Sequence, residues 1–402
     1  MPPKNRPIRL AVVVQHPIHY HLPLYRAMVA DPHIDVNVLY MQRAWSESGF
    51  DPEVAMVVDW GVPMFEGYPY QVFRNASPRR DGEGFWKFIN PGLIWRVMTG
   101  AYDVVYVHGH NHFTHVMCMV AARLGGKRLI LRTDGYNLGE RPLVRKILRW
   151  VLYRLLYKLP QVCLYVGTYN REYFESFGVP DARLVYAPYA VDNAYFTEQA
   201  RRLGGQKAAL KAEFGIAPDA SVILFPAKFM EKKQPLRLIE AFCRAGLGDG
   251  WALLMVGDGA LRPAAEALAA RRPDKKIIFA GFLDQSRISR GYAVGEIVAL
   301  PSAYQETWGL VINEALNFGC AVIVSDRVAC GPDLVADACG LIVPWDDTDA
   351  LADALRRLAG DAALRRRFQE QARARIKRWS VDNYMAGLRE ALGLSPAPRD
   401  AG

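Results

Sequence analysis

The chain has 402 residues, of which 51% are hydrophobic and 23% are charged, a balance typical of a protein with two or three globular domains. No apolar run reaches the ~18 residues that would span a bilayer. Six scattered cysteines without a CxxC pair favour a reducing cytoplasm over a disulfide scaffold. The formal net charge is +9, but no zinc-finger, RNA-binding or recognition-helix signature is present, so we expect no nucleic-acid partner.

Short apolar runs that end in polar loops recur through the first half of the chain. The first run is at residues 8–14, and a helical pattern begins at Leu22 after a polar loop. A strand, a polar loop and a helix in this order open a doubly wound α/β sheet. Further strands are expected at 36–40, 104–107, 129–131 and 162–166, the last of which ends the sheet of a first domain at 1–195. Residues 42–90 are rich in Gly, Pro and Trp, which is typical of a long insertion.

Titratable side chains follow three of these predicted strands. His16 and His19 lie in the loop after the first strand, His108 and His110 follow the strand at 104–107, and Asp134 follows the strand at 129–131. Ligands bind at the carboxyl ends of the strands in such sheets. The histidine-rich loop could hold zinc, but no carboxylate or cysteine stands at a ligand spacing. We therefore expect these residues to line a substrate site rather than a metal site.

Residues 141–159 combine basic and apolar residues at helical spacing, with Arg145, Lys146 and Arg149 among Leu, Ile and Val. Three aromatic residues are expected near the polar boundary of this helix: Trp150, Tyr153 and Tyr157. A basic amphipathic helix of this kind can lie on an anionic membrane surface. It can equally pack its apolar side on the core while the stems of Arg and Lys extend to solvent. The sequence leaves both interpretations open.

The second half of the chain alternates strands and helices. After a helical, alanine-rich connection at 193–220, strands are expected at 222–226, 252–256 and 277–280, and helices at 234–245, 260–271 and 285–293. This alternation predicts a second parallel sheet with helices on both faces, in a domain at 206–375. Gly257 and Gly259 form only a GxG, so the dinucleotide fingerprint of dehydrogenases is absent. The acidic run at 346–349 resembles a metal cluster, but we expect Asp349 in the first turn of a helix.

The stretch 297–326 is predicted to form a strand, a loop, a helix that ends at Gly319, and a second strand. The loop and the start of the helix offer backbone N–H groups to an anion such as phosphate. Glu306 and Glu314 flank this anion site. A diphosphate would repel both carboxylates, whereas neutral hydroxyls would donate strong hydrogen bonds to them. The pattern therefore favours a ligand with phosphates between hydroxyl-bearing rings, which describes a nucleotide sugar.

The segment PSAYQETWGLVINEALNFGCAVIVSD, at 301–326, resembles the carboxylate signature of retaining glycosyltransferases of family 4, which have the GT-B fold. Further segments match the family in the expected order: APYAVDNAYF at 187–196, ILFPAKFMEKKQPLRLIEAF at 223–242, WALLMVGDGALR at 251–262 and IIFAGFLDQ at 277–285. The resemblance implies two doubly wound, Rossmann-like domains that face each other across a cleft. It also implies that a C-terminal helix at 376–393 crosses back to the first domain.

The resemblance implies roles for residues of the second domain. Lys228 and Lys233, where the family usually has arginine and then lysine, would stabilise the leaving diphosphate, and Glu306 would contact the donor sugar. Further donor contacts would come from the carboxylate of Glu314 to the ribose, the backbone amides of Thr307, Trp308, Gly309 and Leu310 to the phosphates, and Gly281 and Phe282 to the base.

The resemblance also implies roles in the first domain, where the family often has a histidine beside the acceptor hydroxyl. Asp134 stands at that point of this chain, so Asp134, His108 or His110 would serve. The family's glycine pair in the first loop is replaced here by histidines, among them His16 and His19.

The implied activity is transfer of a hexosyl group, with retention, from a UDP- or GDP-sugar to a glycan, lipid-linked or small-molecule acceptor. The implied reaction needs no metal and no cofactor. We expect the protein in the cytoplasm, in peripheral contact with the inner face of the plasma membrane if 141–159 binds lipid. The alternatives are a catalytically inactive GT-B scaffold that binds partners and a GT-B sugar-nucleotide epimerase. Intact lysines and glutamates favour the transferase over the scaffold.

Overall fold

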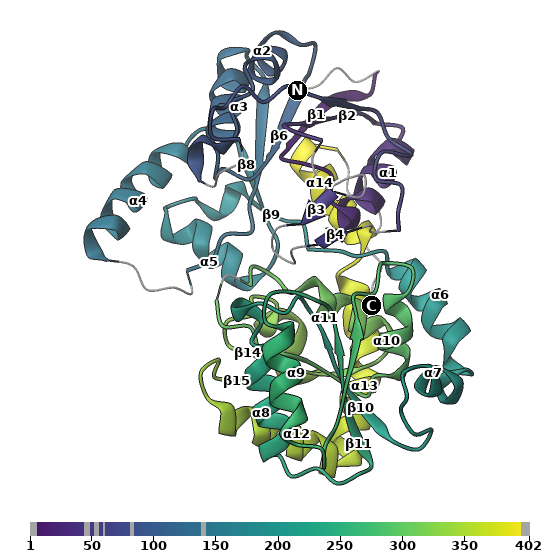
Figure 1. The fold of residues 1–402 in the computed structure, drawn as a ribbon. Helices are drawn as coiled ribbons and strands as arrows, with labels where there is room; N and C mark the ends of the chain where they lie inside the picture. The colour runs from purple at the N-terminus through teal and green to yellow at the C-terminus, as the bar shows by residue number, and fades with distance from the viewer. Residues whose placement is uncertain are drawn as a thin grey trace. The chain divides into compact units, whose positions relative to one another are not determined.

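A computed structural model describes residues 6–43, 49–51, 56–58, 61–80, 84–137, 142–304 and 306–394 of the chain. The chain forms two compact units, each with its own parallel sheet (Figure 1). Unit 1 takes in the described residues of Met1–Gly49, Pro63–Tyr189 and Val381–Ala401, and unit 2 takes in those of Phe50–Val62 and Ala190–Ser380. The two doubly wound α/β sheets predicted from the sequence are confirmed, whereas the domain limits 1–195, 206–375 and 376–393 stay predictions.

Unit 1 is organised around a seven-stranded parallel sheet with the strand order β5-β2-β1-β6-β7-β8-β9. Its strands are β1 (Ile8–Val14), β2 (Ile34–Tyr40), β5 (Tyr70–Val72), β6 (Val104–His108), β7 (Arg128–Arg132), β8 (Val162–Tyr165) and β9 (Leu184–Tyr186). The central strands are runs of buried Val, Leu and Ile, as expected where helices cover both faces of a sheet. Since β1 pairs with β2 on one side and with β6 on the other, the strand order reverses there. Such a reversal is where open sheets bind ligands.

The helices of unit 1 are α1 (Leu22–Ala30), α2 (Pro91–Thr99), α3 (Phe113–Leu124), α4 (Leu143–Leu156), α5 (Thr168–Ser176) and α14 (Val381–Leu392). Helix α14 comes from the C-terminal end of the chain and packs beside α1 (Figure 1). Arg389 of α14 forms an ion pair with Asp31, the residue after α1. The hydroxyl of Tyr384 lies 3.1 Å from that of Tyr106 in β6. These contacts make α14 part of the core of unit 1.

Unit 2 holds a six-stranded parallel sheet with the order β12-β11-β10-β13-β14-β15. Its strands are β10 (Ser221–Pro226), β11 (Trp251–Val256), β12 (Lys276–Gly281), β13 (Ile297–Leu300), β14 (Ala321–Ser325) and β15 (Gly340–Val343). Its helices are α6 (Asn193–Gly204), α7 (Lys207–Glu213), α8 (Pro235–Arg244), α9 (Arg262–Ala270), α10 (Ile288–Val294), α11 (Leu310–Asn317), α12 (Thr348–Gly360) and α13 (Ala362–Arg375). The strand order reverses at β10, which pairs with β11 and β13.

Two short strands, β5 and β9, were not expected from the sequence. The strand at 162–166 does not end the first sheet, because β9 pairs with β8 from Cys163↔Leu184 onward. Part of the expected insertion at 42–90 belongs to the sheet as well, because β5 pairs with β2 from Val38↔Tyr70. The short strands β3 (Gly49–Asp51) and β4 (Met56–Val58) form a separate pair, and much of the remaining insertion lies outside the described residues. A strand of three residues is too short for periodicity to reveal.

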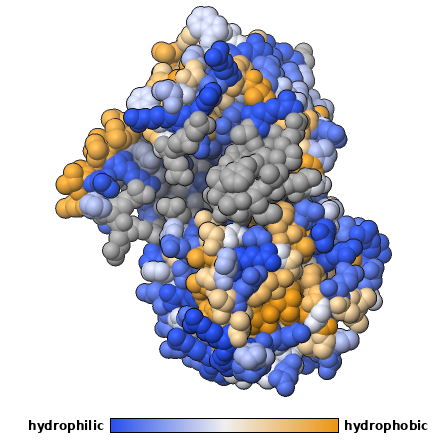
Figure 2. Space-filling view, viewed as in Figure 1, coloured by the Kyte–Doolittle hydropathy of each residue, from blue (hydrophilic) through white to orange (hydrophobic). Residues whose placement is uncertain are grey.

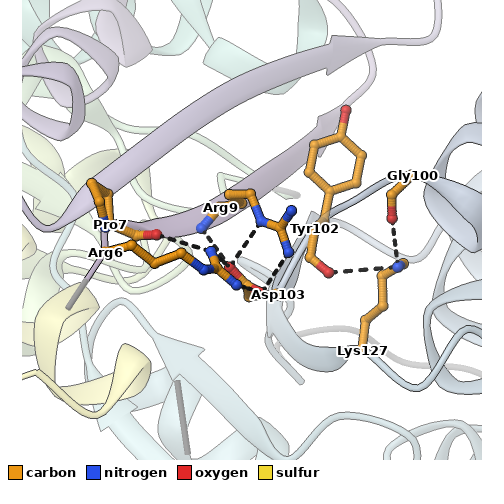
Figure 3. Close-up of polar contacts among 7 residues, drawn as sticks. All are labelled: Arg6, Pro7, Arg9, Gly100, Tyr102, Asp103 and Lys127. Atoms are coloured by element: carbon orange, nitrogen blue, oxygen red, sulfur yellow. Dashed lines mark hydrogen bonds and ion pairs between the residues drawn. The ribbon is translucent and has the colours of Figure 1, made fainter. Parts of the chain in front are cut away.

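A charged cluster joins the amino ends of the central strands of unit 1 (Figure 3). Asp103, the residue before β6, accepts hydrogen bonds from the guanidinium of Arg6 at 2.7 and 2.8 Å and from the backbone N–H of Arg9 at 2.9 Å. Lys127, the residue before β7, donates to the carbonyl of Gly100 at 2.6 Å. The hydrogen bond from Arg6 holds the pKa of Asp103 well below its ordinary value. The cluster therefore holds β1, β6 and β7 together at their amino ends, whereas the predicted site lies at their carboxyl ends.

Candidate functional site

The central contact of unit 2 is an ion pair between Lys233 and Glu306. Lys233 ends a 3-10 turn after β10, and Glu306 lies in the loop after β13. Lys233 Nζ donates to Glu306 Oε2, and the hydroxyl of Ser302 donates to the same oxygen at 3.0 Å. The side chains of Lys233 and Glu306 are only 16% and 9% exposed. Because β10 and β13 are neighbours at the reversal of strand order, their loops meet where ligands bind in such sheets.

The Glu306 carboxylate is kept ionised by its cationic neighbours. Burial on its own would raise the pKa of this group. The ammonium groups of Lys233 and Lys232, together with the hydrogen bonds from Lys233 and Ser302, outweigh burial and hold the pKa below its ordinary value. An ionised carboxylate only accepts hydrogen bonds. Glu306 is therefore suited to contact sugar hydroxyls beside a cation that is suited to contact phosphate.

Glu314 is the second buried carboxyl group of this region, and its electrostatic setting differs. It lies within α11, where its side chain accepts a hydrogen bond from the Tyr292 hydroxyl of α10 at 2.7 Å. Burial raises the pKa of Glu314 to about 7, although the hydrogen bond from Tyr292 opposes the rise. The charge of Glu314 therefore changes near neutral pH. Titratable groups shifted in this way are enriched at functional sites.

The segment between the two glutamates is held rigidly. Gly309 has a φ of +94°, and a Cβ there would lie 3.0 Å from Val328 Cγ1, so glycine is required at this position. The indole N–H of Trp308 donates to Asn313 Oδ1 at 2.8 Å. Thr307, Trp308 and Gly309 lead directly into Leu310, the first residue of α11. The N-terminus of a helix attracts anions because its first N–H groups lack intrahelical partners.

The loops after β10, β11 and β12 lie together, and they hold the other predicted donor contacts. The backbone N–H of Ala227, one residue before Lys228, donates to the carbonyl of Val256 at 3.0 Å. Gly257 N–H donates to the carbonyl of Gly281 at 2.8 Å. A Cβ at Gly257, whose φ is +140°, would lie 2.1 Å from the carbonyl oxygen of Ala227. Lys228, Gly281 and Phe282 therefore all lie at the carboxyl ends of the strands of this sheet.

In unit 1 the predicted residues lie at or just after the ends of β1, β6 and β7, with His108 as the last residue of β6 and His19 at the start of a 3-10 turn. His110 Nε2 lies 3.3 Å from the hydroxyl of Tyr157, and the ring of Tyr153 packs edge-on to His110 with centroids 4.7 Å apart. The hydroxyl of Tyr189 donates to Asp134 Oδ2 at 3.0 Å. The field of Asp134 acts on His110, so these two residues share a neighbourhood.

The four predicted histidines, His16, His19, His108 and His110, are neutral at pH 7, because burial lowers the pKa of each. The pKa is about 4 for His110, His16 and His19 and about 3 for His108, where the charge of Arg132 adds to burial. A neutral imidazole can donate one hydrogen bond and accept another, which suits contact with hydroxyls. The charges of Lys87 and His112 also lower the pKa of His16.

Three contributors to these sites were not assigned a role from the sequence. Arg132 is only 1% exposed, and its guanidinium lies over the rings of Tyr189 and Tyr384 with distances of 4.8 and 4.9 Å to the centroids. In the sequence, the indication of a role for Arg132 was that an arginine directly follows the apolar run at 129–131. Ser302 stood in the recognised motif without a role, whereas nothing in the sequence linked Tyr292 to Glu314.

The acidic run at 346–349 belongs to a helix start, as predicted. Asp347 caps α12 by accepting a hydrogen bond from the N–H of Ala350 at 2.8 Å. Asp349 lies in the first turn and pairs with Arg244 at 2.9 Å. Within the described part of the chain, no three His, Cys, Asp or Glu residues are grouped to hold a metal ion. The predicted absence of a metal stays a prediction.

Two family models match the chain. The model described as Glycosyltransferase Family 4 matches residues 35–195, and the model described as Glycosyl transferases group 1 matches residues 206–375. The matched regions include His110 and Asp134 in one unit and the Lys233–Glu306 pair in the other. The chain belongs to the family 4 glycosyltransferases.

Curated relatives are moderately similar to the chain. It is 30% identical over 234 residues to a D-inositol 3-phosphate glycosyltransferase of Nocardia farcinica, covering 56% of this chain and 50% of that protein. It is 26% identical over 296 residues to a GDP-mannose-dependent monoacylated alpha-(1-6)-phosphatidylinositol monomannoside mannosyltransferase of Corynebacterium glutamicum, covering 70% and 74%. The chain spans about half the length of the first of these relatives and of others that it matches.

Solved structures of other proteins share the fold. The structure of HepE from Anabaena in complex with UDP and glucose aligns with a TM-score of 0.69 and 15% identity, covering 96% of this chain and 99% of that one. The two Rossmann-like domains of the GT-B fold that the resemblance implied are thereby confirmed.

Proposed function

We propose that the protein is a retaining glycosyltransferase that transfers a hexosyl group from a UDP- or GDP-sugar to a hydroxyl group of a glycan, a lipid-linked glycan or a small molecule. The observation that carries this proposal is the shielded Lys233–Glu306 ion pair, which lies at the reversal of strand order in unit 2. This pair presents a cation for phosphate next to a carboxylate for sugar hydroxyls. A nucleotide sugar needs both within a short distance.

The donor would bind with its diphosphate between the lysines and the start of α11. Lys233 and Lys228 would stabilise the negative charge that grows on the leaving diphosphate. Glu306 would accept hydrogen bonds from the sugar, Glu314 would accept them from the ribose, and the base would lie against Gly281 and Phe282. The charge on the diphosphate grows only in the transition state, so the lysines stabilise that state more than the ground state. The ribose contacts are made equally in the ground state and in the transition state.

The transfer step exchanges one bond at the anomeric carbon for another. The bond from that carbon to the diphosphate oxygen breaks, and a bond to the acceptor oxygen forms on the same face of the sugar. The acceptor proton moves to the leaving phosphate. His110 and Asp134 are the groups of unit 1 that we assign to orienting the acceptor hydroxyl, with His16, His19 and His108 lining the acceptor region.

The proposed mechanism uses no divalent metal and no cofactor. In metal-dependent transferases a cation neutralises the diphosphate. Here Lys233, Lys228 and the start of α11 would supply that positive charge. Activity is therefore expected to persist in EDTA, and a complete loss that Mn²⁺ or Mg²⁺ restores would overturn this part of the proposal.

The named relatives support the range of donors and acceptors. One solved neighbour is described in complex with UDP and glucose, and one relative is described as GDP-mannose-dependent and acting on a phosphatidylinositol monomannoside. Both nucleotides therefore belong in the first screen, together with lipid-linked acceptors. A lipid-linked acceptor would place the protein at the inner face of the plasma membrane.

A panel of nucleotides and nucleotide sugars tests the proposal. UDP or GDP should raise the Tm, because a ligand of the native state stabilises it, and mass spectrometry should then find a glycosylated acceptor. The absence of a shift with any nucleoside diphosphate at millimolar concentration would reject the donor site. Binding without any product would favour the inactive scaffold, and a donor sugar released with inverted stereochemistry at another carbon would favour the epimerase.

A further inference from the structure

Helix α4 turns an apolar side to solvent. Within Leu143–Leu156, all of which the structure describes, no side chain is buried. Seven aliphatic residues are between 43% and 77% exposed: Leu143, Val144, Ile147, Leu148, Val151, Leu152 and Leu155. At 100° per residue they cover about half of the circumference of the helix. Figure 2 shows this apolar patch at the left edge, over α4. Contiguous exposed apolar surface of this kind marks an interaction site.

The opposite side of α4 fixes this orientation. The guanidinium of Arg149 donates to the Tyr173 hydroxyl at 2.8 Å and lies over the rings of Tyr153 and Phe177. Tyr157, the residue after α4, is 1% exposed. The interpretation in which the apolar side packs on the core is therefore wrong. The expected place of Tyr153 and Tyr157 at the polar boundary is also wrong, because aromatic rings and the stacked guanidinium form the inner side.

The charged residues of α4 itself are all positive. No aspartate or glutamate occurs between residues 142 and 171. Arg145 and Arg154 are exposed and lie at the two margins of the apolar side, and exposed Lys146 and Lys158 add further positive charge. Apolar residues bordered by cations are the pattern of helices that lie in the interface of an anionic bilayer.

We propose that the outer side of α4 docks on a bilayer that contains anionic lipids, with the helix parallel to the surface. A second copy of the chain fits this surface less well, because the cations at both margins would repel one another. In addition, a stable protein interface takes about 20–30 residues from each side, whereas this surface offers seven aliphatic residues. Arg149 is excluded from lipid contact, since its guanidinium is engaged on the inner side.

The inner side of the same helix touches the candidate acceptor site. Tyr153 and Tyr157 contact His110 by ring packing and through the hydroxyl, respectively. A bilayer on the outer side would lie about one helix diameter, ~10–12 Å, from His110. This position suits a lipid-linked acceptor whose sugar extends from the headgroup region. That consequence rests on the proposed function, whereas docking requires neither donor nor acceptor.

Flotation of the full chain with vesicles tests the docking. The protein should bind phosphatidylcholine vesicles that contain phosphatidylglycerol at low salt, and binding should weaken as NaCl is raised. Leu148→Gln with Leu152→Gln should reduce binding at least about tenfold, because two apolar side chains no longer leave water. Arg145→Gln with Lys146→Gln should reduce binding about fivefold per charge, and only on the anionic vesicles.

Matched controls come from α3, in the same unit. Leu124 is 76% exposed, so Leu124→Gln removes a leucine that is more exposed than Leu148 or Leu152, and Arg123→Gln removes an exposed cation. Neither should change binding. Absence of binding at low salt, equal losses in the α3 controls, or a dimer in light scattering that the α4 double variant dissociates would each overturn the docking. Vesicle binding without any nucleotide-induced shift in Tm would leave the docking standing and reject the proposed transferase.

Discussion

The hydroxyl of Tyr292 donates a hydrogen bond to the carboxyl group of Glu314 at 2.7 Å, and both side chains are buried between α10 and α11. The bond satisfies one oxygen of a group that has left water. Burial nevertheless dominates and raises the pKa of Glu314 to about 7. Glu314 therefore gains or loses its charge within the pH range in which the protein would act.

Donor affinity should depend on pH through Glu314. If ribose hydroxyls donate to the ionised carboxylate, the dissociation constant for UDP or GDP should rise up to about tenfold for each pH unit below 7 and stay level above it. Calorimetric titrations between pH 5.5 and 8.5 measure this dependence. Glu314→Gln should bind more weakly and lose the dependence. An equal wild-type affinity at pH 6 and pH 8 would contradict the assigned role.

The stability of the folded protein should respond to the same group in the opposite sense. A carboxyl group whose pKa is raised on folding binds its proton more tightly in the folded state than in the unfolded one. Its contribution to the free energy of unfolding is largest below the ordinary pKa of 4.5 and declines as pH rises to about 7. Glu314→Gln should therefore gain in Tm relative to the wild type between pH 5 and 7.5. A constant difference would show that Glu314 does not titrate there.

Loss of the Lys233 ammonium should affect both chemistry and folding. Lys233→Ala should reduce kcat by about 10²–10³, because the leaving diphosphate loses a positioned charge. It should also lower the free energy of unfolding by about 3 kcal/mol, because Glu306 stays buried without its cation. Lys233→Met combined with Glu306→Gln removes both charges and should recover much of the stability but none of the activity. Wild-type turnover in Lys233→Ala and in Glu306→Gln would reject both roles.

A methyl group at Gly257 should disturb the loop that carries Lys228. The Cβ would lie 2.1 Å from the carbonyl oxygen of Ala227, and the φ of +140° is one that other residues rarely adopt. We expect Gly257→Ala to lower the free energy of unfolding by about 3 kcal/mol and to weaken donor binding. Gly204 has open space around it, so Gly204→Ala should change stability by less than about 1 kcal/mol. Equal urea midpoints for the two variants would contradict this account.

The Asp103 cluster should stabilise unit 1 without influencing catalysis. Asp103→Ala leaves the hydrogen bonds from Arg6 and Arg9 unmade at the amino ends of β1 and β6. A loss of about 2 kcal/mol in the free energy of unfolding follows, with unchanged KM for the donor. Asp181, which is 77% exposed and pairs with Arg171, is the control, and Asp181→Ala should leave the Tm nearly unchanged. A donor KM that rises in Asp103→Ala would show that the cluster does more than hold the strands.

The strand–helix–strand segment that carries both glutamates, from β13 to β14, was predictable because the sequence patterns that define it are local. The buried strands β13 and β14 are continuous apolar runs, and Gly309 and Gly319 bound the helix between them. Glu314 is the fifth residue of the helix, so its position relative to the helix start follows from the helical repeat, and Glu306 lies only four residues before that start. The same reasoning placed the long strands of both sheets, whose apolar runs need no distant partner to be recognised.

Tertiary structure alone decided which groups meet across the fold. Tyr292 is 22 positions from Glu314, and Tyr189 is 55 positions from Asp134, so spacing carries no sign of either hydrogen bond. The three-residue strands β5 and β9 exist because longer strands beside them supply partners for their backbone groups. The sequence of α4 determined a helix with an apolar side and cations at its margins. Which side faces the protein was decided by Arg149, whose guanidinium stacks on rings from a different helix and so turns the aliphatic residues to solvent.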